Sequence, residues 1–124
     1  MGDFEDRIES VLDDYKCPSC HGHIFLKAAI IEANKADTPM FLSIGELLGD
    51  VAKVHGTTYD RVERSLRNLI TKWYPLLKGF LFDIRPTNRQ LVAKFYMLVI
   101  EDQELEDETE EDDMLFSIYP KLYG

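Results

Sequence analysis

Apolar residues recur every three or four positions along most of this chain, which is the spacing that places them on one face of an α-helix. The pattern predicts helices over residues 3–15, 22–34 and 43–54, then one that starts after Thr57 and a last one that starts after Thr87. The buried face of the third helix is expected to comprise Ile44, Leu47, Leu48 and Val51. The sequence therefore predicts an all-α fold.

Residues 74–85 interrupt this periodicity, because Pro75 and Gly79 stand there among apolar side chains. Both residues oppose a regular helix, so we expect an irregular but buried connection. Thr87 followed by Gln90 fits a capping box at the start of the last helix. The core-facing residues of that helix are expected to be Leu91, Val92, Phe95, Leu98 and Val99.

The helix after Thr57 has two faces of different character. Its apolar stripe is spaced i, i+4, i+7, i+8 and i+11 and comprises Val62, Leu66, Leu69, Ile70 and Trp73. Its polar side chains are the candidate binding residues Arg61, Glu63, Arg64, Arg67, Asn68 and Lys72. Thr57 with Asp60 fits a capping box just before the arginines. Arginine forks suit the O6 and N7 acceptors of guanine, and a carboxylate accepts from cytosine N4.

Ala52, Gly56 and Val62 stand at the small, turn and buried positions of a helix-turn-helix. A small residue allows two helices to cross closely, and glycine permits the positive φ of a short turn. An ordinary helical hairpin with solvated surface charges shows the same spacing. The spacing alone leaves both interpretations open.

Two motifs carry a resemblance to a known family, the R-V-E-R-x-x-R core at residues 61–67 and the P-T-N at residues 86–88. The chain resembles, from about residue 22 to 99, the C-terminal DNA-binding domain of the sporulation response regulator family, stage zero sporulation protein A. The resemblance implies an all-helical bundle of about six helices that reads a TGTCGAA-type box from the major groove. It further implies Arg64 on a guanine, Glu63 on a cytosine, and Arg67 and Arg61 on base or phosphate.

The chain also departs from that family pattern. Only about twenty residues precede the matched region, so we expect no phosphoacceptor receiver domain. A preceding Cys-x-x-Cys segment and a following acidic tail are additional features. The expected organisation is an acidic helix and Cys-x-x-Cys turn (1–21), a helix-turn-helix domain (22–100), an acidic linker (101–113) and an apolar end (114–124).

The charge is distributed unevenly along the 124 residues, whose formal net charge is −9. Residues 1–14 carry a net −5 and residues 101–124 a net −9, whereas residues 15–100 carry a net +5. The basic excess lies in the predicted binding domain, where phosphate neutralisation requires it. The chain has no signal peptide and no long apolar run, so we expect a cytoplasmic location and no membrane contact.

Cys17, Cys20, His21 and His23 form the one group with ligand chemistry. Two thiolates at this spacing supply half of a tetrahedral zinc site, but the other half has no convincing ligands. A metal site and a redox pair remain open, and a turn between helices with buried thiols is favoured. We expect no metal, no cofactor and no stoichiometric zinc. The chain has neither a phosphate-cradling glycine loop nor an arranged nucleophile, which indicates a non-enzymatic protein.

The acidic run at residues 101–113 holds ten carboxylates and no basic residue. Such runs are commonly solvated and flexible, whereas the apolar end that follows is expected to dock on its own domain or on a partner. One hypothesis is that the run competes with DNA for the arginines and is autoinhibitory.

The sequence thus predicts a sequence-specific DNA-binding transcription regulator whose partner is double-stranded DNA. A homodimer on DNA and a protein partner for the acidic tail are open alternatives. The alternative function is a protein-interaction module or DNA-mimic-like antagonist that keeps the fold but acts through its acidic segments.

Overall fold

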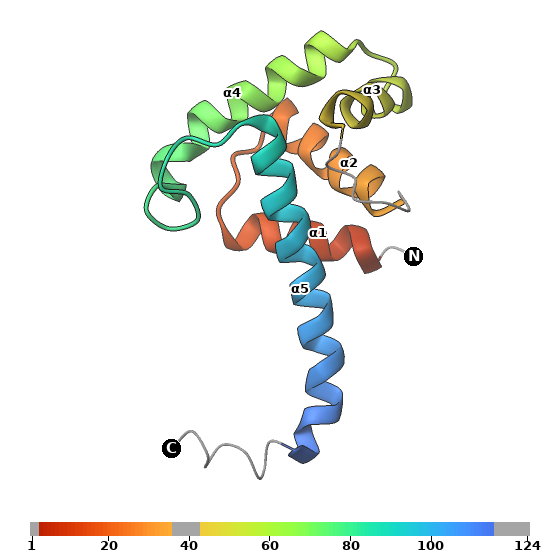
Figure 1. Cartoon of the computed structure of the whole chain (residues 1–124), viewed down its shortest axis with the longest axis vertical. Helices are drawn as coiled ribbons and strands as arrows, with labels where there is room; N and C mark the ends of the chain where they lie inside the picture. Colours follow the sequence, from red (N-terminus) through yellow and green to blue (C-terminus); the bar gives the residue numbers. More distant parts are fainter. Residues whose placement is uncertain (1–2, 36–42, 116–124) are drawn as a thin grey trace.

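The computed structural model describes residues 3–35 and 43–115, with side chains as far as Glu101. These residues form five α-helices: α1 (Asp3–Asp14), α2 (His21–Lys35), α3 (Ile44–Val54), α4 (Tyr59–Leu77) and α5 (Asn88–Leu115) (Figure 1). The all-α fold class predicted from the sequence is confirmed. The described residues contain five helices, one fewer than the approximate number that the resemblance implies.

Helix α2 is the centre of the bundle, because it contacts each of the other four helices and contacts α4 most extensively. A helix that is apolar on most of its surface has to be covered on several sides. The buried residues of α2 are Gly22, Phe25, Leu26, Ala28, Ala29, Ile30 and Ala33. This packing holds α3 and α4 on one side of the molecule, away from α1 (Figure 1).

Three aromatic residues join α1, α4 and α5. The indole of Trp73 stacks on Phe95 with ring centroids 4.8 Å apart, and both side chains are fully buried. Trp73 Nε1 donates a hydrogen bond of 2.9 Å to the carbonyl oxygen of Tyr15, so its polar atom is satisfied. Tyr15 also meets Phe95 edge-on at 5.6 Å. Trp73 therefore anchors α4 to the turn that follows α1.

Gly22 marks the closest approach between α2 and α4. A β-carbon built on Gly22 would lie 2.5 Å from Cβ of Leu69 and 2.6 Å from the carbonyl oxygen of Ser65. These distances are well inside van der Waals contact, so the crossing needs a residue without a side chain. The glycine is required by tertiary packing rather than by its own backbone conformation.

The connection between α4 and α5 differs from the sequence prediction. Helix α4 continues through Pro75 to Leu77, whereas an irregular connection was expected from residue 74 onward. Pro75 lies in the last turn, where the loss of one backbone donor is tolerated more easily than in a helix interior. Leu77 is buried, but Leu76, Phe80 and Ile84 are exposed, so the expectation of a buried connection is wrong for these three residues.

The acidic run also differs in its backbone conformation. The sequence predicts a flexible linker over residues 101–113, and the structure instead continues α5 through them to Leu115. The helix projects beyond the bundle and leads away from α4 (Figure 1). Most of the predicted apolar end, residues 116–124, lies outside the described residues.

Candidate nucleic-acid interface

Helices α3 and α4 form the predicted helix-turn-helix, and a hydroxyl side chain caps the start of each helix. Ser43 Oγ accepts a hydrogen bond of 3.2 Å from the backbone N–H of Glu46 at the start of α3. Thr58 Oγ1 accepts one of 3.2 Å from the backbone N–H of Arg61 at the start of α4. The expectation that Thr57 caps α4 with Asp60 is therefore wrong by one residue.

The turn explains this shift of one residue. Gly56 adopts a φ of +63°, as its predicted role requires. The backbone N–H of Thr57 then reaches back to the carbonyl oxygen of Ala52 at 2.9 Å and completes the end of α3. Because Thr57 belongs to the end of α3, Thr58 is the first residue free to cap α4. Ala52 is buried between the helices, as expected for a small residue.

The predicted binding residues of α4 occupy three positions around the helix. The buried stripe confirms the sequence prediction, since Val62, Leu66, Leu69, Ile70 and Trp73 are all at most 2% exposed. At 100° per residue, Arg64 and Asn68 then lie on the ridge opposite the core. Arg61 and Lys72 flank this ridge on one side, and Glu63 and Arg67 flank it on the other. All of these except the half-buried Glu63 are exposed.

Glu63 and Arg67 are engaged with each other in this structure. Arg67 Nη2 forms an ion pair with Glu63 Oε1 one helical turn away, and the side chains are 56% and 31% exposed, respectively. Exposed pairs of this spacing contribute only about 0.3–0.5 kcal/mol. The ion pair therefore orients the side chains of two predicted reading residues but is weak enough to open when another partner is available.

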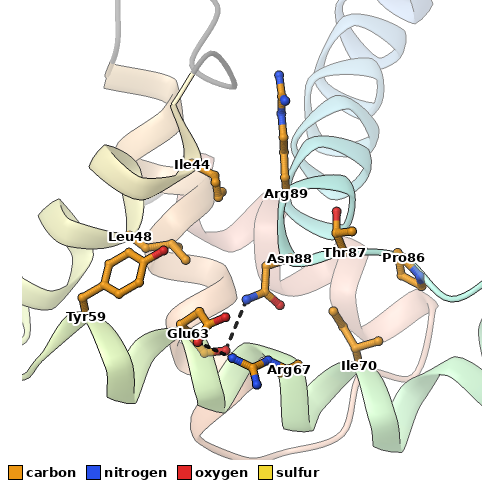
Figure 2. Close-up of a pocket in the computed structure, with 10 residues that line it drawn as sticks. All are labelled: Ile44, Leu48, Tyr59, Glu63, Arg67, Ile70, Pro86, Thr87, Asn88 and Arg89. Carbon is orange, nitrogen blue, oxygen red and sulfur yellow. Dashed lines mark hydrogen bonds and ion pairs between the residues drawn. The ribbon is translucent and has the colours of Figure 1, made fainter.

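A cavity of about 340 Å³ separates this side of α4 from α3 and the start of α5 (Figure 2). Its lining residues are Ile44, Leu48, Tyr59, Glu63, Arg67, Ile70, Pro86, Thr87, Asn88 and Arg89. In Figure 2 the side chain of Asn88 points toward Glu63 and Arg67, and its Nδ2 donates a hydrogen bond of 3.2 Å to the carbonyl oxygen of Glu63. The P-T-N motif thus lies directly against the predicted reading helix.

The sequence prediction did not assign a role to Asn88, Arg89 or Arg85. The signal was present in the P-T-N motif, which the resemblance singled out without a role. Arg85 Nη2 donates to Thr71 Oγ1 at 2.5 Å, one turn of α4 beyond Arg67. Only the tertiary fold shows that residues 85–88 contact α4.

The N-terminal cysteines and histidines do not line this cavity. Cys17 and Cys20 are free and half-buried, and they pack against the hydrophobic core. Burial, followed by the neighbouring Cys20 and Glu9, raises the pKa of the Cys17 thiol to about 12. A thiol with this pKa stays protonated at neutral pH, and the thiolate is the nucleophilic form. Within residues 3–35 and 43–101, no group of three His, Cys, Asp or Glu side chains could hold a metal ion.

His23 is bonded to a carboxylate of α1. Its Nε2 lies 3.1 Å from Glu9 Oε1, and Lys27 Nζ lies 2.9 Å from Glu9 Oε2. The hydrogen bond from Lys27, and after it the one from His23, lowers the pKa of Glu9 against the opposing effect of burial. Glu9 of α1 and the side chains of His23 and Lys27 of α2 therefore form a charged contact between the two helices.

No helix in the part of the chain that the structure describes combines the length and the apolar character needed to cross a bilayer.

The comparison with protein families agrees with the α3–α4 arrangement. The family described as sporulation initiation factor Spo0A C terminal matches residues 8–99. The chain belongs to this family. Among curated proteins, no sequence matches the chain. The Spo0A C-terminal family consists of DNA-binding regulatory domains and not of enzymes, and it is associated with transcription control in sporulation.

The family match is longer than the resemblance suggested. It begins at residue 8, so it includes most of α1 and the Cys17–Cys20 turn, which were expected to precede the matched region. In the structure Ile8, Val11 and Leu12 of α1 are buried in the core. The first helix of this Spo0A C-terminal domain is thus part of the bundle.

Proposed function

We propose that this chain is a sequence-specific transcription regulator that inserts α4 into the major groove of a TGTCGAA-type box. Arg64 would bind a guanine, Glu63 would accept from a cytosine, and Arg61 and Arg67 would bind base or phosphate. Asn68 lies beside Arg64 on the same ridge, and Lys72 is the phosphate contact. The proposal places the protein in the cytoplasm and includes a homodimer on DNA as one arrangement.

The observation that carries this proposal is the outer ridge of α4. Arg64 and Asn68 point away from the core, on a helix whose opposite face is buried against α2, α3 and α5. A DNA-reading helix needs both properties, because the scaffold must hold it rigidly while its reading side chains stay free. Membership of the Spo0A C-terminal family supports DNA as the ligand.

The Glu63–Arg67 ion pair is compatible with base reading on energetic grounds. Opening an exposed pair of this kind costs about 0.3–0.5 kcal/mol. A well-aligned contact to a base edge contributes about 1–3 kcal/mol of discrimination. Replacing the Glu63–Arg67 ion pair by a contact from Glu63 to a cytosine and one from Arg67 to a base or phosphate is therefore favourable in free energy.

A gel-shift titration of the full chain with a TGTCGAA-type duplex tests the proposal. A scrambled duplex of equal composition and length serves as the control, and both titrations are repeated at several salt concentrations. We expect tighter binding of the box at each salt concentration. Equal affinity for the two duplexes at every salt concentration would rule out sequence-specific reading.

We also infer a second candidate function, a protein-interaction module or DNA-mimic-like antagonist of a related regulator. The observation that favours it is the projection of α5 beyond the bundle, in a stretch where the sequence holds ten carboxylates within residues 101–113. A segment with this many acidic residues suits a partner with a basic surface.

Competition with a DNA-bound relative separates this function from DNA reading. The chain is added to a complex of another member of the family with its own DNA box. An antagonist releases the relative from the DNA at low salt, and a variant with Gln and Asn in place of the carboxylates at residues 101–113 does not. A chain that binds the box itself and releases no relative acts as the regulator proposed first.

A further inference from the structure

Residues 85–88, which we call the clamp, run alongside one ridge of α4. The ridge comprises Glu63, Arg67 and Thr71, spaced four residues apart. Arg85 at the start of the clamp donates to Thr71 Oγ1, and Asn88 at its end donates to the carbonyl oxygen of Glu63. The two attachments are eight residues apart on α4, which corresponds to about 12 Å along the helix. Arg67 lies between them.

The clamp is itself rigid. Pro86 is buried and has a restricted φ. Thr87 and Gln90 form the predicted capping box, since the backbone N–H of Thr87 donates to Gln90 Oε1 at 2.9 Å and that of Gln90 donates to Thr87 Oγ1 at 3.1 Å. Asn88 is the first residue of α5, so its side chain is held by a fixed helix start. A rigid clamp with two attachments constrains both the tilt and the rotation of α4.

The contact from Asn88 is the inner attachment. The Arg85–Thr71 hydrogen bond joins two exposed residues, whereas Asn88 is half-buried in the cavity between α4 and α5 (Figure 2). Its Oδ1 is buried and has no hydrogen-bond partner among the described residues. The amide therefore orients itself through the donor that contacts Glu63. Glu63 is also one of the residues that contact a DNA base in the proposed function.

We propose that Asn88 is a positioning residue for DNA reading: it sets the orientation of the first half of α4 and thereby the sequence discrimination of the chain, without contacting a base. This inference rests on the proposed function, because it names what holds the reading helix in register. A bidentate base contact depends on angle and distance, so a small rotation of α4 weakens the correct contacts. Phosphate contacts by flexible lysines tolerate such a rotation.

Three variants of the full chain test this role. Asn88→Ala removes the donor. Asn88→Asp keeps the shape, cannot donate at neutral pH, and places a negative charge at a helix N-terminus, where it favours folding. Glu9→Gln is the stability control, because it weakens the contact between α1 and α2 and touches neither α4 nor the clamp. Affinities for the TGTCGAA-type and scrambled duplexes are measured against salt, with thermal unfolding beside them.

We expect both Asn88 variants to lower the affinity ratio of box to scrambled duplex by about three- to tenfold, which is the range that one neutral hydrogen bond supports. The slope of affinity against salt should stay that of the wild type in Asn88→Ala, since both side chains are neutral and no charge is changed. Glu9→Gln should lower the stability slightly at neutral pH and keep the ratio of the wild type. Asn88→Asp should keep the unfolding temperature of the wild type and still lower the ratio.

Amide hydrogen exchange supplies a readout that needs no DNA. Exchange in the first half of α4 should be faster in both Asn88 variants than in the wild type and in Glu9→Gln. The positioning role is wrong if the Asn88 variants exchange as slowly as the wild type in this part of α4. It is also wrong if the wild type prefers the box and the Asn88 variants keep the same affinity ratio. An equal loss for both duplexes overturns it too, because a phosphate contact by Asn88 would carry no sequence information. A wild type without any preference refutes the proposed function instead, and the exchange result still decides whether the clamp holds α4.

Discussion

Arg64 and Lys72 are both exposed on α4, but they lie at different angles from the buried stripe. Arg64 is on the outer ridge, where a guanidinium fork can enter a groove, and Lys72 is on the flank. Arg64→Ala should therefore weaken binding of the TGTCGAA-type duplex by about 1–3 kcal/mol and flatten the preference at one guanine position. Binding to a panel of duplexes with single base changes measures this effect.

Lys72→Ala is the matched control for that variant. It removes a charge from the same helix but should weaken all duplexes alike, because a phosphate contact carries no sequence information. If Arg64→Ala keeps the full preference across the panel, the assignment of α4 as the reading helix is wrong.

The stability of the α1–α2 contact should depend on pH through Glu9. Its pKa is lowered in the folded state, first by the hydrogen bond from Lys27. The stability that this carboxylate contributes is present above the ordinary pKa range of a glutamate and is lost as the pH falls through the lowered value. Glu9→Gln should therefore be less stable than the wild type at neutral pH, and the difference should vanish at acidic pH. The side chain is 45% exposed, so solvent screening keeps the effect small.

Urea unfolding of the two proteins between neutral pH and pH about 3 measures the Glu9 contribution. Glu5→Gln changes an exposed residue of the same helix and is the control. A difference between wild type and Glu9→Gln that stays constant over this pH range would show that the loss at neutral pH comes from packing rather than from the charge.

At the scale of elements, the crossing of α2 and α4 depends on Gly22. Gly22→Ala should destabilise the fold by about 1–3 kcal/mol, because the added methyl group overlaps Leu69 and the backbone of Ser65 and the two helices must separate. DNA affinity should fall with stability, since α4 would shift. Thermal unfolding and a gel shift measure the two effects.

Gly45 and Gly49 are the controls for the Gly22 substitution, since both lie in α3 and a β-carbon at either position meets no atom within 4 Å. Alanine at these positions should stabilise the fold by about 0.5–1 kcal/mol through helix propensity. A stabilising effect of Gly22→Ala would mean that α2 and α4 are farther apart than the structure shows.

At the scale of the whole molecule, the acidic helix and the reading helix are separated. Glu101 lies about 20 Å along α5 from Asn88, which contacts α4. That distance exceeds the Debye length of about 8 Å at physiological salt, whereas at 0.01 M salt the Debye length is about 30 Å. A chain that ends at Ile100 should therefore bind DNA more tightly than the full chain at low salt and about equally at physiological salt, with the same sequence preference.

The salt series distinguishes this long-range effect from autoinhibition by direct contact. Circular dichroism checks that the shortened chain is folded, and a full-length variant with the carboxylates of residues 101–113 changed to Gln and Asn is the control. A gain in affinity that persists at physiological salt would show that the C-terminal part of the chain contacts the reading face directly. In that case the distance along α5 does not prevent the acidic tail from reaching α4, and the autoinhibitory hypothesis holds.

Local patterns were sufficient to place the five helices, though not the C-terminal ends of α4 and α5, and to identify the outer face of α4. The spacing of Val62, Leu66 and Trp73 identified the buried side of α4, and the exposure of Arg64 follows from it by helical geometry. The capping box of Thr87 and Gln90 was also predicted correctly, because a cap involves residues only three positions apart. The cap at Thr57 was misplaced because Thr57 with Asp60 fits the motif, whereas the actual cap, Thr58, is followed three residues later by Arg61. The end of α3 decides between the two threonines.

Contacts between distant residues were decided only by the tertiary structure. The hydrogen bond from Asn88 to Glu63 spans 25 residues, and no periodic pattern relates those two positions. The overlap that Gly22 avoids depends on how closely α2 crosses α4, which is set by the whole core. Periodicity specifies which side of each helix is apolar, since that property repeats every turn. It does not specify which partner covers that side, because packing is chosen among all helices at once.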